Sequence, residues 1–235
     1  MTANLKTYDN REDFVFAAVQ AMHTACAGAV GQRGIFTVAV PGGTTPKPLF
    51  EALAQSPGEM DWERTHVFFT DERCVDPADS RSNYFNADSL CLSRVGVSEY
   101  NVHRIPGEKG AGEAVREAEA DTRAFFGGDG MPALDLVVLG MGPDGHVASL
   151  FPGSQALEAD GSLYVAEEEP GRDPRVPRVS MSMPFILAAR KVVVLVRRKG
   201  KEKMVDAVMR GELDRSVPAA RVAPSATVEW LVRAD

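Results

Sequence analysis

Cysteine is scarce in this 235-residue chain, and its three residues lie far apart in the sequence. Cys26, Cys74 and Cys91 form no C-x-x-C pair, so neither a disulfide framework nor a zinc cluster is indicated. Uninterrupted apolar runs reach only about strand length, short of the ~20 residues that span a bilayer, and no basic-then-apolar leader precedes Asp9. We therefore expect a protein of the reducing cytoplasm with no membrane partner.

Net positive charge is also missing. The formal net charge is -7 and the isoelectric point is near 5.2, which argues against general nucleic-acid binding because that function needs a basic surface. Residues 190–203 form a basic island, with seven lysines and arginines against Glu202 alone. Such an island in an acidic chain favours a small anionic molecule as the partner.

The stretch from Leu134 to Pro152 organises the rest of the chain. An apolar run over 134–139 predicts a strand buried on both faces of a parallel sheet. Gly140, Gly142 and Gly145 follow it and predict a tight turn that leads into a helix, with Asp144 and His146 at the carboxyl end of the strand. Ligands bind at that edge of open α/β sheets. A plain strand-to-helix turn, in which His146 only caps or packs, is the competing interpretation.

A second glycine-rich turn has the same placement. Residues 35–40 predict another buried strand, and Pro41-Gly42-Gly43-Thr44-Thr45-Pro46 comes before a helix. Free amides and the positive end of that helix would form a cradle for an anion. The turn matches neither the P-loop nor the G-x-G-x-x-G pattern, so it implies no nucleotide. Thr44 or Thr45 could instead be a simple N-cap.

Other segments support the same class of fold. A D-x-x-E capping box at Asp9 opens a helix that runs to about residue 30, further helices are predicted over 112–126 and 200–209, and strands over 67–70, 178–182, 191–196 and 227–232. Asp71-Glu72-Arg73 follows the strand at 67–70 and is either a salt-bridged rim or part of a site. Residues 167–177 predict a solvated loop, and His66 and His103 stand in no motif. We predict a single α/β domain over residues 1–235.

Lys201 and Lys203 fall in the first turn of the helix predicted at 200–209. Cations there oppose the helix macrodipole, at a cost of about 0.3 to 1 kcal/mol each when exposed. A bound phosphate would remove that conflict.

These features together resemble the 6-phosphogluconolactonase family, which hydrolyses 6-phospho-D-glucono-1,5-lactone in the pentose phosphate pathway. The resemblance covers nearly the whole chain. It rests on six groups of motifs in family order: VAVPGGTTP at 38–46, FFTDERCV with SRSNY at 68–84, LDLVVLGMGPDGHVASLFPG at 134–153, RVSMSMPFILAARKVVVLV at 178–196, GKEK at 200–203, and PAARV with VEWLV near the end.

The resemblance implies a mostly parallel central sheet flanked by helices on both faces, related to the sugar-phosphate isomerases and deaminases, and no cofactor or metal. It makes His146 the catalytic base. The positions it places at the substrate are Gly42, Gly43, Thr44, Asp71, Arg73, Gly142, Arg178 and Lys203. The chain departs from the family pattern at Pro41, where a small residue is usual, and at Thr44, which replaces the commoner serine.

A δ-lactone is an activated ester, so its hydrolysis needs a deprotonated water, a fixed carbonyl and support for the oxyanion. A histidine suits the first task. The chain has no G-x-S-x-G elbow, so we expect direct attack by water. Asp144 would orient His146 or bind a sugar hydroxyl, while Arg73, Arg178 and Lys203 would bind anionic groups. Which of them holds the phosphate stays open. We expect a monomer or a weak homo-oligomer.

Two rival functions are considered. Glucosamine-6-phosphate deaminases share the glycine turns and the histidine, but their histidine is followed by a glutamate that takes part in ring opening. Residues 147–152 here contain no acid. A non-catalytic sugar-phosphate sensor usually carries an added DNA-binding module, and the helix predicted near Asp9 leaves little chain for one.

Overall fold

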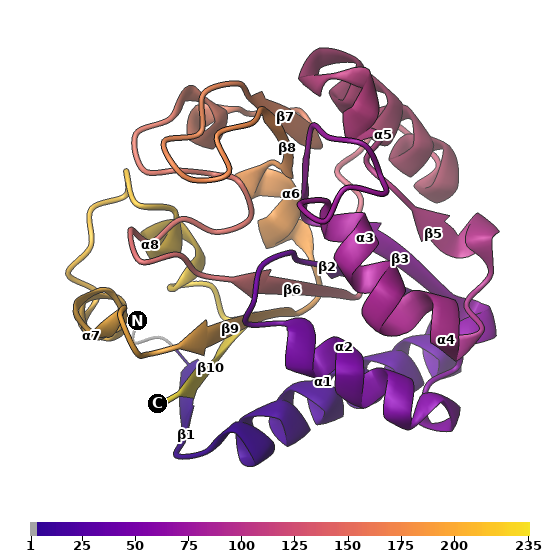
Figure 1. Cartoon of the computed structure of the whole chain (residues 1–235), viewed down its shortest axis with the longest axis horizontal. Helices are drawn as coiled ribbons and strands as arrows, with labels where there is room; N and C mark the ends of the chain where they lie inside the picture. Colours follow the sequence, from indigo (N-terminus) through magenta and orange to yellow (C-terminus); the bar gives the residue numbers. More distant parts are fainter. Residues whose placement is uncertain (1–3) are drawn as a thin grey trace.

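The fold is built around a seven-stranded parallel sheet. It is seen in a computed structural model that describes residues 4–235. Figure 1 shows the sheet between two layers of helices, and its strand order is β1-β10-β9-β6-β2-β3-β5. These strands are β1 (Asn4–Tyr8), β2 (Phe36–Val40), β3 (Thr65–Phe69), β5 (Val102–His103), β6 (Leu136–Gly140), β9 (Val192–Arg197) and β10 (Val228–Arg233).

Eight α-helices in the described part of the chain cover the sheet. They are α1 (Arg11–Arg33), α2 (Lys47–Gln55), α3 (Asn83–Ala87), α4 (Ser93–Val95), α5 (Ala111–Phe126), α6 (Met183–Ala188), α7 (Glu202–Arg210) and α8 (Pro218–Val222). Right-handed crossovers place α1 and α2 on one face, and α5, α6 and α8 on the other (Figure 1). The predicted sheet with helices on both faces is confirmed.

The central strands form where the sequence is apolar and β-branched. All five residues of β2 are buried, as are Leu136 to Leu139 of β6 and Val192 to Val196 of β9. A strand buried on both faces can lie only in the interior of a sheet covered by helices. The edge strand β1 has no such run, and the sequence did not predict it.

The start of α1 differs from the prediction by one residue. Asn10, and not Asp9, is the N-cap, because its side-chain oxygen accepts a hydrogen bond from the amide of Asp13 at 2.8 Å. The helix is long and apolar enough, by length and composition, to cross a membrane. It instead lies against the sheet, where Phe14, Met22 and Cys26 are buried, as in a core helix.

A small antiparallel sheet stands beside the large one. Its order is β4-β8-β7, formed by β4 (Asp71–Arg73), β7 (Tyr164–Glu167) and β8 (Arg178–Met181). The sequence predicted a strand over 178–182, one residue longer than β8, but not this pairing. Because β4 follows β3 after one residue, the small sheet extends from the carboxyl edge of the large one and places β8 there.

The chain reverses its direction of travel across the large sheet between β2 and β6. From β2 it proceeds through β3 to β5 at one edge, whereas from β6 it proceeds through β9 to β10 on the other side. The connections that leave β2 and β6 therefore diverge, and a crevice opens beyond the carboxyl ends of these neighbouring strands. Such a switch point is where open α/β sheets bind their ligands.

Candidate active site

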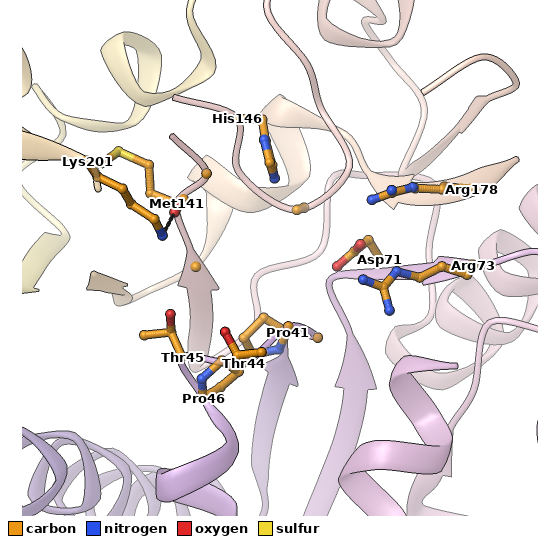
Figure 2. A pocket seen from close by; sticks show the side chains of 15 residues that line it. Pro41, Thr44, Thr45, Pro46, Asp71, Arg73, Met141, His146, Arg178 and Lys201 are labelled. Atoms are coloured by element: carbon orange, nitrogen blue, oxygen red, sulfur yellow. Dashed lines mark hydrogen bonds between the residues drawn. The ribbon is translucent and has the colours of Figure 1, made fainter. Parts of the chain in front are cut away.

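A cleft of about 200 Å³ occupies this switch point. Figure 2 shows the side chains that line it, with His146 between two groups of residues. Thr44, Thr45 and Lys201 lie toward one end, and Asp71, Arg73 and Arg178 lie toward the other. The segments of the described chain that contribute to the cleft are 41–46, 71–73, 140–148, Arg178 and Lys201.

The loop after β2 needs both of its glycines, for different reasons. Gly43 has φ of +88°, in the region that side chains other than glycine rarely adopt. A Cβ on Gly42 would lie 1.8 Å from the side-chain oxygen of Asn83. The loop leads into α2, whose N-cap is Pro46 and carries no side-chain cap. In the first turn of α2, Pro48 has no N–H and the amides of Leu49 and Phe50 bond to the carbonyl of Pro46. Within residues 4–235 the amides of the loop, from Gly42 to Thr45, and of Lys47 have no partner, so these are the amides available to an anion.

The alternative role of Thr44 and Thr45 as helix caps does not fit this geometry, because Pro46 occupies the N-cap position. Across residues 4–235, no group forms a hydrogen bond with either threonine hydroxyl. Both threonines line the cleft. The structure thus leaves two hydroxyls beside the free end of α2.

His146 and Asp144 form a hydrogen-bonded pair in the loop after β6. His146 Nδ1 lies 2.6 Å from Asp144 Oδ1, and the backbone amide of His146 donates to the same oxygen at 3.3 Å. An ionised carboxylate only accepts, so it keeps the proton of a neutral imidazole on Nδ1. In the described part of the chain nothing hydrogen-bonds Nε2, and the ring points into the cleft (Figure 2). Nε2 is therefore free to accept a proton there.

Asp144 is held in its ionised form. Burial by itself would raise the pKa of its carboxyl, but hydrogen bonds from His146 and Arg172 and the charge of His146 outweigh burial and lower the pKa well below its ordinary value. Arg172 Nε donates to Asp144 Oδ2 at 2.7 Å. Both oxygens of the carboxylate are thus engaged, and Asp144 itself is poorly suited to accept a proton from water.

Gly142 makes room for this pair. A Cβ at position 142 would lie 2.1 Å from Cε1 of His146 and 2.8 Å from Oδ1 of Asp144. No side chain fits there unless the imidazole moves. Gly142 therefore lines the cleft mainly because the His146 ring occupies the space of its missing side chain.

The helix start that the sequence predicts after Gly145 is not formed. Val147 instead makes isolated bridges with Met141 and with Leu150, and Ala148 has φ of 48°. Left-handed backbone at a residue with a side chain is strained and is found mostly where surrounding structure enforces it. Here the buried side chains of Val147 and Leu150 anchor the turn, and Ala148 between them lines the cleft.

Successive side chains of a strand point to opposite faces, so Asp71 and Arg73 face the cleft while Glu72 faces away from it. Asp71 is buried in the cleft wall, where its oxygens accept from Thr70 Oγ1 at 3.1 Å and Ser149 Oγ at 2.7 Å. Glu72 points away and accepts hydrogen bonds from three backbone amides and the hydroxyl of Ser82. The triplet therefore supplies two residues to the cleft and one structural anchor.

Arg73 and Arg178 are direct neighbours across the small sheet. The register of β4 and β8 pairs them, although like charges directly opposite each other are unfavourable. Arg73 donates to the carbonyl of Arg81 at 2.6 Å, and Arg178 donates to the carbonyl of Pro174 at 3.1 Å. The Nε of each arginine is buried with no hydrogen-bond partner in residues 4–235. An anion beside the two guanidinium groups would offset the repulsion between their charges.

Arg178 also contacts the ring beneath His146. Its guanidinium carbon lies 5.4 Å from the centroid of Phe151, and the His146 and Phe151 centroids are 4.8 Å apart. Burial lowers the pKa of Arg178, while the charge of Asp71 opposes that change. The charged guanidinium of Arg178 is thus held close to His146 although its burial costs free energy.

The lysine that lines the cleft is Lys201, whereas Lys203, which the resemblance places at the substrate, does not line it. α7 begins at Glu202, so Lys203 lies in its exposed first turn and outside the cleft lining. Lys201 precedes the helix, lines the cleft and donates from Nζ to the carbonyl of Met141. Burial, followed by the charge of Arg197, lowers the pKa of Lys201. Sequence reasoning missed it because the choice depends on where the helix begins.

Possible metal ligands do not gather at the cleft. Within residues 4–235, no three His, Cys, Asp or Glu side chains lie close enough together to hold a metal ion. His66 and His103, which the sequence left unrelated, do meet: His66 Nδ1 lies 3.2 Å from His103 Nε2 across β3 and β5. They are not part of the cleft lining.

Comparisons with known proteins identify the family and the fold. Residues 9–230 match the model of the family described as glucosamine-6-phosphate isomerases/6-phosphogluconolactonase. The 6-phosphogluconolactonase of Nostoc sp. is 35% identical over 210 residues, which cover 88% of this chain and 85% of the relative. The crystal structure of 6-phosphogluconolactonase from Thermotoga maritima is 27% identical, with a TM-score of 0.85 and coverage of 98% and 99%.

The same fold extends to a deaminase. A monomeric glucosamine-6-phosphate deaminase is similar with a TM-score of 0.82 over 98% of this chain and 97% of its own. Its identity is 15%, so this likeness concerns the fold alone. The architecture is therefore shared by two chemistries, and the choice between them depends on the residues of the site.

Proposed function

This chain belongs to the glucosamine-6-phosphate isomerase/6-phosphogluconolactonase family, and we propose that its cleft hydrolyses 6-phospho-D-glucono-1,5-lactone to 6-phospho-D-gluconate, the second step of the oxidative pentose phosphate pathway. One observation carries the proposal at the level of the site. The unpartnered Nε2 of His146 points into a cleft with cationic groups at both ends. Such a cleft suits a substrate with a phosphate at one end and a carbonyl that becomes anionic at the other.

His146 acts as the general base. Nε2 takes a proton from a water molecule as the water oxygen forms a bond to C1 of the lactone. The carbonyl electrons move onto its oxygen and return as the C1–O5 bond breaks, and the proton on the imidazolium passes to O5. The products are a hydroxyl at C5 and a carboxylic acid, which ionises to a carboxylate. Asp144 keeps Nδ1 protonated and stabilises the transient imidazolium.

The two ends of the cleft take different parts of the substrate. Arg178 and His146 both contact Phe151, so the carbonyl that His146 attacks through water lies nearest the arginine end. There Arg178, with Arg73, stabilises the oxyanion and then the product carboxylate. The phosphate lies at the other end, against the amides of the Gly42–Thr45 loop, the positive end of α2 and Lys201.

Asp71 places a negative charge near the two arginines. It is buried between Thr70 and Ser149, and its charge acts on Arg178. Two hydroxyl donors leave part of its lone-pair capacity open toward the cleft. We assign it the binding of a sugar hydroxyl, which keeps it out of proton transfer.

Deamination of glucosamine 6-phosphate is the alternative on the same fold. Residues 147–152 contain no carboxylate to open a sugar ring, and Val147 and Leu150 in that segment are buried apolar side chains. The site therefore favours the lactonase. We further propose that the enzyme works in the cytoplasm as a monomer or a weak homo-oligomer, which light scattering of the purified protein tests.

The test compares freshly prepared 6-phosphogluconolactone with unphosphorylated gluconolactone, each corrected for spontaneous hydrolysis. A substrate without the phosphate forgoes at least one charge-assisted hydrogen bond worth roughly 1.5 to 3 kcal/mol, so its kcat/KM should be at least about 10- to 100-fold lower. Equal kcat/KM values for the two lactones would contradict the proposal. Release of ammonia from glucosamine 6-phosphate at a comparable rate would favour the deaminase instead.

A further inference from the structure

The loop between β7 and β8 reaches the catalytic pair. The sequence predicts a solvated segment over residues 167–177, and most of its side chains are indeed exposed. Arg172 is different, because its Nε donates to Asp144 Oδ2 at 2.7 Å. Asp144 is only 22% exposed and Arg172 is 43% exposed, so the ion pair forms at the rim of the cleft.

Hydrogen bonds link Arg172, Asp144 and His146 in that order. Asp144 receives Arg172 on Oδ2 and His146 Nδ1 on Oδ1, the latter at 2.6 Å. The same loop also holds the cationic end of the cleft, since Arg178 Nη2 donates to the carbonyls of Arg172 at 3.3 Å and Pro174 at 3.1 Å. One short segment thus contacts both the orienter of the base and the arginine beside it.

We propose that Arg172 is a positioning residue for His146, which fixes the Asp144 carboxylate and limits how strongly that carboxylate holds a proton on the imidazole. The proposal rests on the assignment of His146 as the base. Arg172 does not line the cleft and touches no reacting atom. It acts through Asp144, whose second oxygen has no other hydrogen-bond partner in residues 4–235.

Two consequences follow from removing Arg172. Asp144 Oδ2 would be left without its partner, so the carboxylate could rotate and the imidazole would be less well oriented. The charge of Asp144 would also be uncompensated, which stabilises the imidazolium form of His146 and keeps the base protonated to higher pH.

The other charged groups around His146 are held by contacts that do not involve the side chain of Arg172, since Arg178 bonds only to backbone carbonyls of that loop in residues 4–235. Arg178 lies across the ring of Phe151, and Asp71 is tied to Ser149. Lys201 is bound to the carbonyl of Met141 on the other side of the loop. A change in the pH profile would therefore report the Arg172–Asp144 interaction.

The loop offers a matched control. Arg175 lies three positions along and is 80% exposed, and within residues 4–235 it pairs only with the carboxylate of Asp173, at 3.8 Å. Arg175→Met makes the same change in charge and size as Arg172→Met, within the same segment, without touching Asp144. Both positions are on an exposed loop, so neither variant should unfold the protein. Thermal denaturation checks this.

The kinetic experiment measures kcat and kcat/KM for 6-phosphogluconolactone against pH in wild type, Arg172→Met, Arg172→Lys and Arg175→Met. In Arg172→Met the acidic limb should move to higher pH by roughly half to one pH unit, as expected for removal of one partly screened charge. kcat at the optimum should fall roughly three- to tenfold, with affinity for 6-phosphogluconate unchanged. Arg172→Lys should recover part of this activity. Superposable profiles for Arg172→Met and Arg175→Met would overturn the proposal.

A second readout needs no substrate. Nitrogen-15 NMR of the imidazoles, with the His146 signals identified by their absence in His146→Asn, follows the protonation of His146 directly. In Arg172→Met these signals should titrate at higher pH than in wild type, and Arg175→Met should leave them in place. That result would support the role of Arg172 even if the lactone assay failed, and an unchanged titration would overturn it even if the assay succeeded.

Discussion

Aspartate and arginine side chains meet both at the amino ends and at the carboxyl ends of the central strands, but their interactions differ between these two edges. At the amino edge, Asp135 is buried just before β6. Its Oδ1 accepts from Arg33 at 2.6 Å and lies 3.4 Å from Arg190. Its Oδ2 accepts from the amide of Thr37 at 2.9 Å and from the Thr37 hydroxyl at 3.0 Å. Every oxygen of this carboxylate is used inside the protein.

The carboxyl edge has the same residue types in an open arrangement. Arg73 and Arg178 face each other, and each has a buried Nε without a partner in residues 4–235. Asp71 is bound by hydroxyls and forms no ion pair with either arginine in that part of the chain. The first edge holds the fold together, whereas the second keeps its hydrogen-bonding capacity for a ligand. The two edges should therefore respond in opposite ways to mutation.

Asp135→Ala should have the largest effect on stability. It removes the acceptor for two arginines and for the Thr37 amide, and breaking such a buried pair costs about 3 kcal/mol or more. Urea denaturation measures the decrease. Since Asp135 lies at the edge away from the cleft, the folded fraction should keep its kcat. A decrease below about 1 kcal/mol would show that water replaces these interactions, and that the amino edge is not the closed one.

Arg178→Met should produce the reverse pattern. If Arg178 supports the oxyanion as proposed, kcat/KM should fall roughly 10²- to 10³-fold. Stability in urea should be unchanged or higher, because a buried cation opposite Arg73 is removed. Near-normal activity in a strongly destabilised variant would mean that Arg178 is a structural residue, like those around Asp135.

Lys201→Met and Lys203→Met compare two lysines two residues apart. Lys201 lines the cleft and Lys203 is exposed outside it. If Lys201 holds the phosphate as proposed, kcat/KM for the phosphorylated lactone should fall about 10- to 100-fold in Lys201→Met. Unphosphorylated gluconolactone should not distinguish this variant from wild type. A larger effect from Lys203→Met would restore the prediction made from the G-x-x-K motif.

The smallest expected effect is that of Asp144→Asn on how the unfolding free energy depends on pH. Its pKa is lowered from an ordinary 3.8 in the folded protein, so the ionised carboxylate stabilises the fold. That contribution is fully present above the unfolded pKa and is lost as pH falls through the folded one. The difference in unfolding free energy between wild type and Asp144→Asn should be constant above about pH 5 and shrink below about pH 4. A difference that grows in acid would contradict this sign.

The central strands were predictable from the sequence because burial on both faces demands continuous apolar residues. Leu136 to Leu139 and Val192 to Val196 show this directly. The loop residues Gly42, Gly43, Gly142 and His146 were predictable for a related reason. A tight turn after a buried strand requires glycines, which are visible in the local sequence. The resemblance to known lactonases then predicts that these turns bind the substrate and that His146 is the base.

Features that depend on tertiary pairing were not predictable. The pairing of Arg73 with Arg178 joins strands about a hundred residues apart, and its register is set by packing of the small sheet. Whether Lys201 or Lys203 lines the cleft depends on whether α7 begins at residue 200 or 202. Sequence patterns do not locate the end of a helix to within two residues. Arg172 carried no signal, because a polar loop does not reveal which of its side chains turns inward.

His146→Asn tests the central claim most directly. Asparagine keeps a polar side chain of similar size but cannot take a proton from water, so kcat for 6-phosphogluconolactone should fall about 10²- to 10⁴-fold. Binding of 6-phosphogluconate, measured by calorimetry, should largely survive, because the groups assigned to its phosphate lie elsewhere in the cleft. If kcat stays near the wild-type value, His146 only shapes the loop, and Asp71 becomes the next candidate for the base.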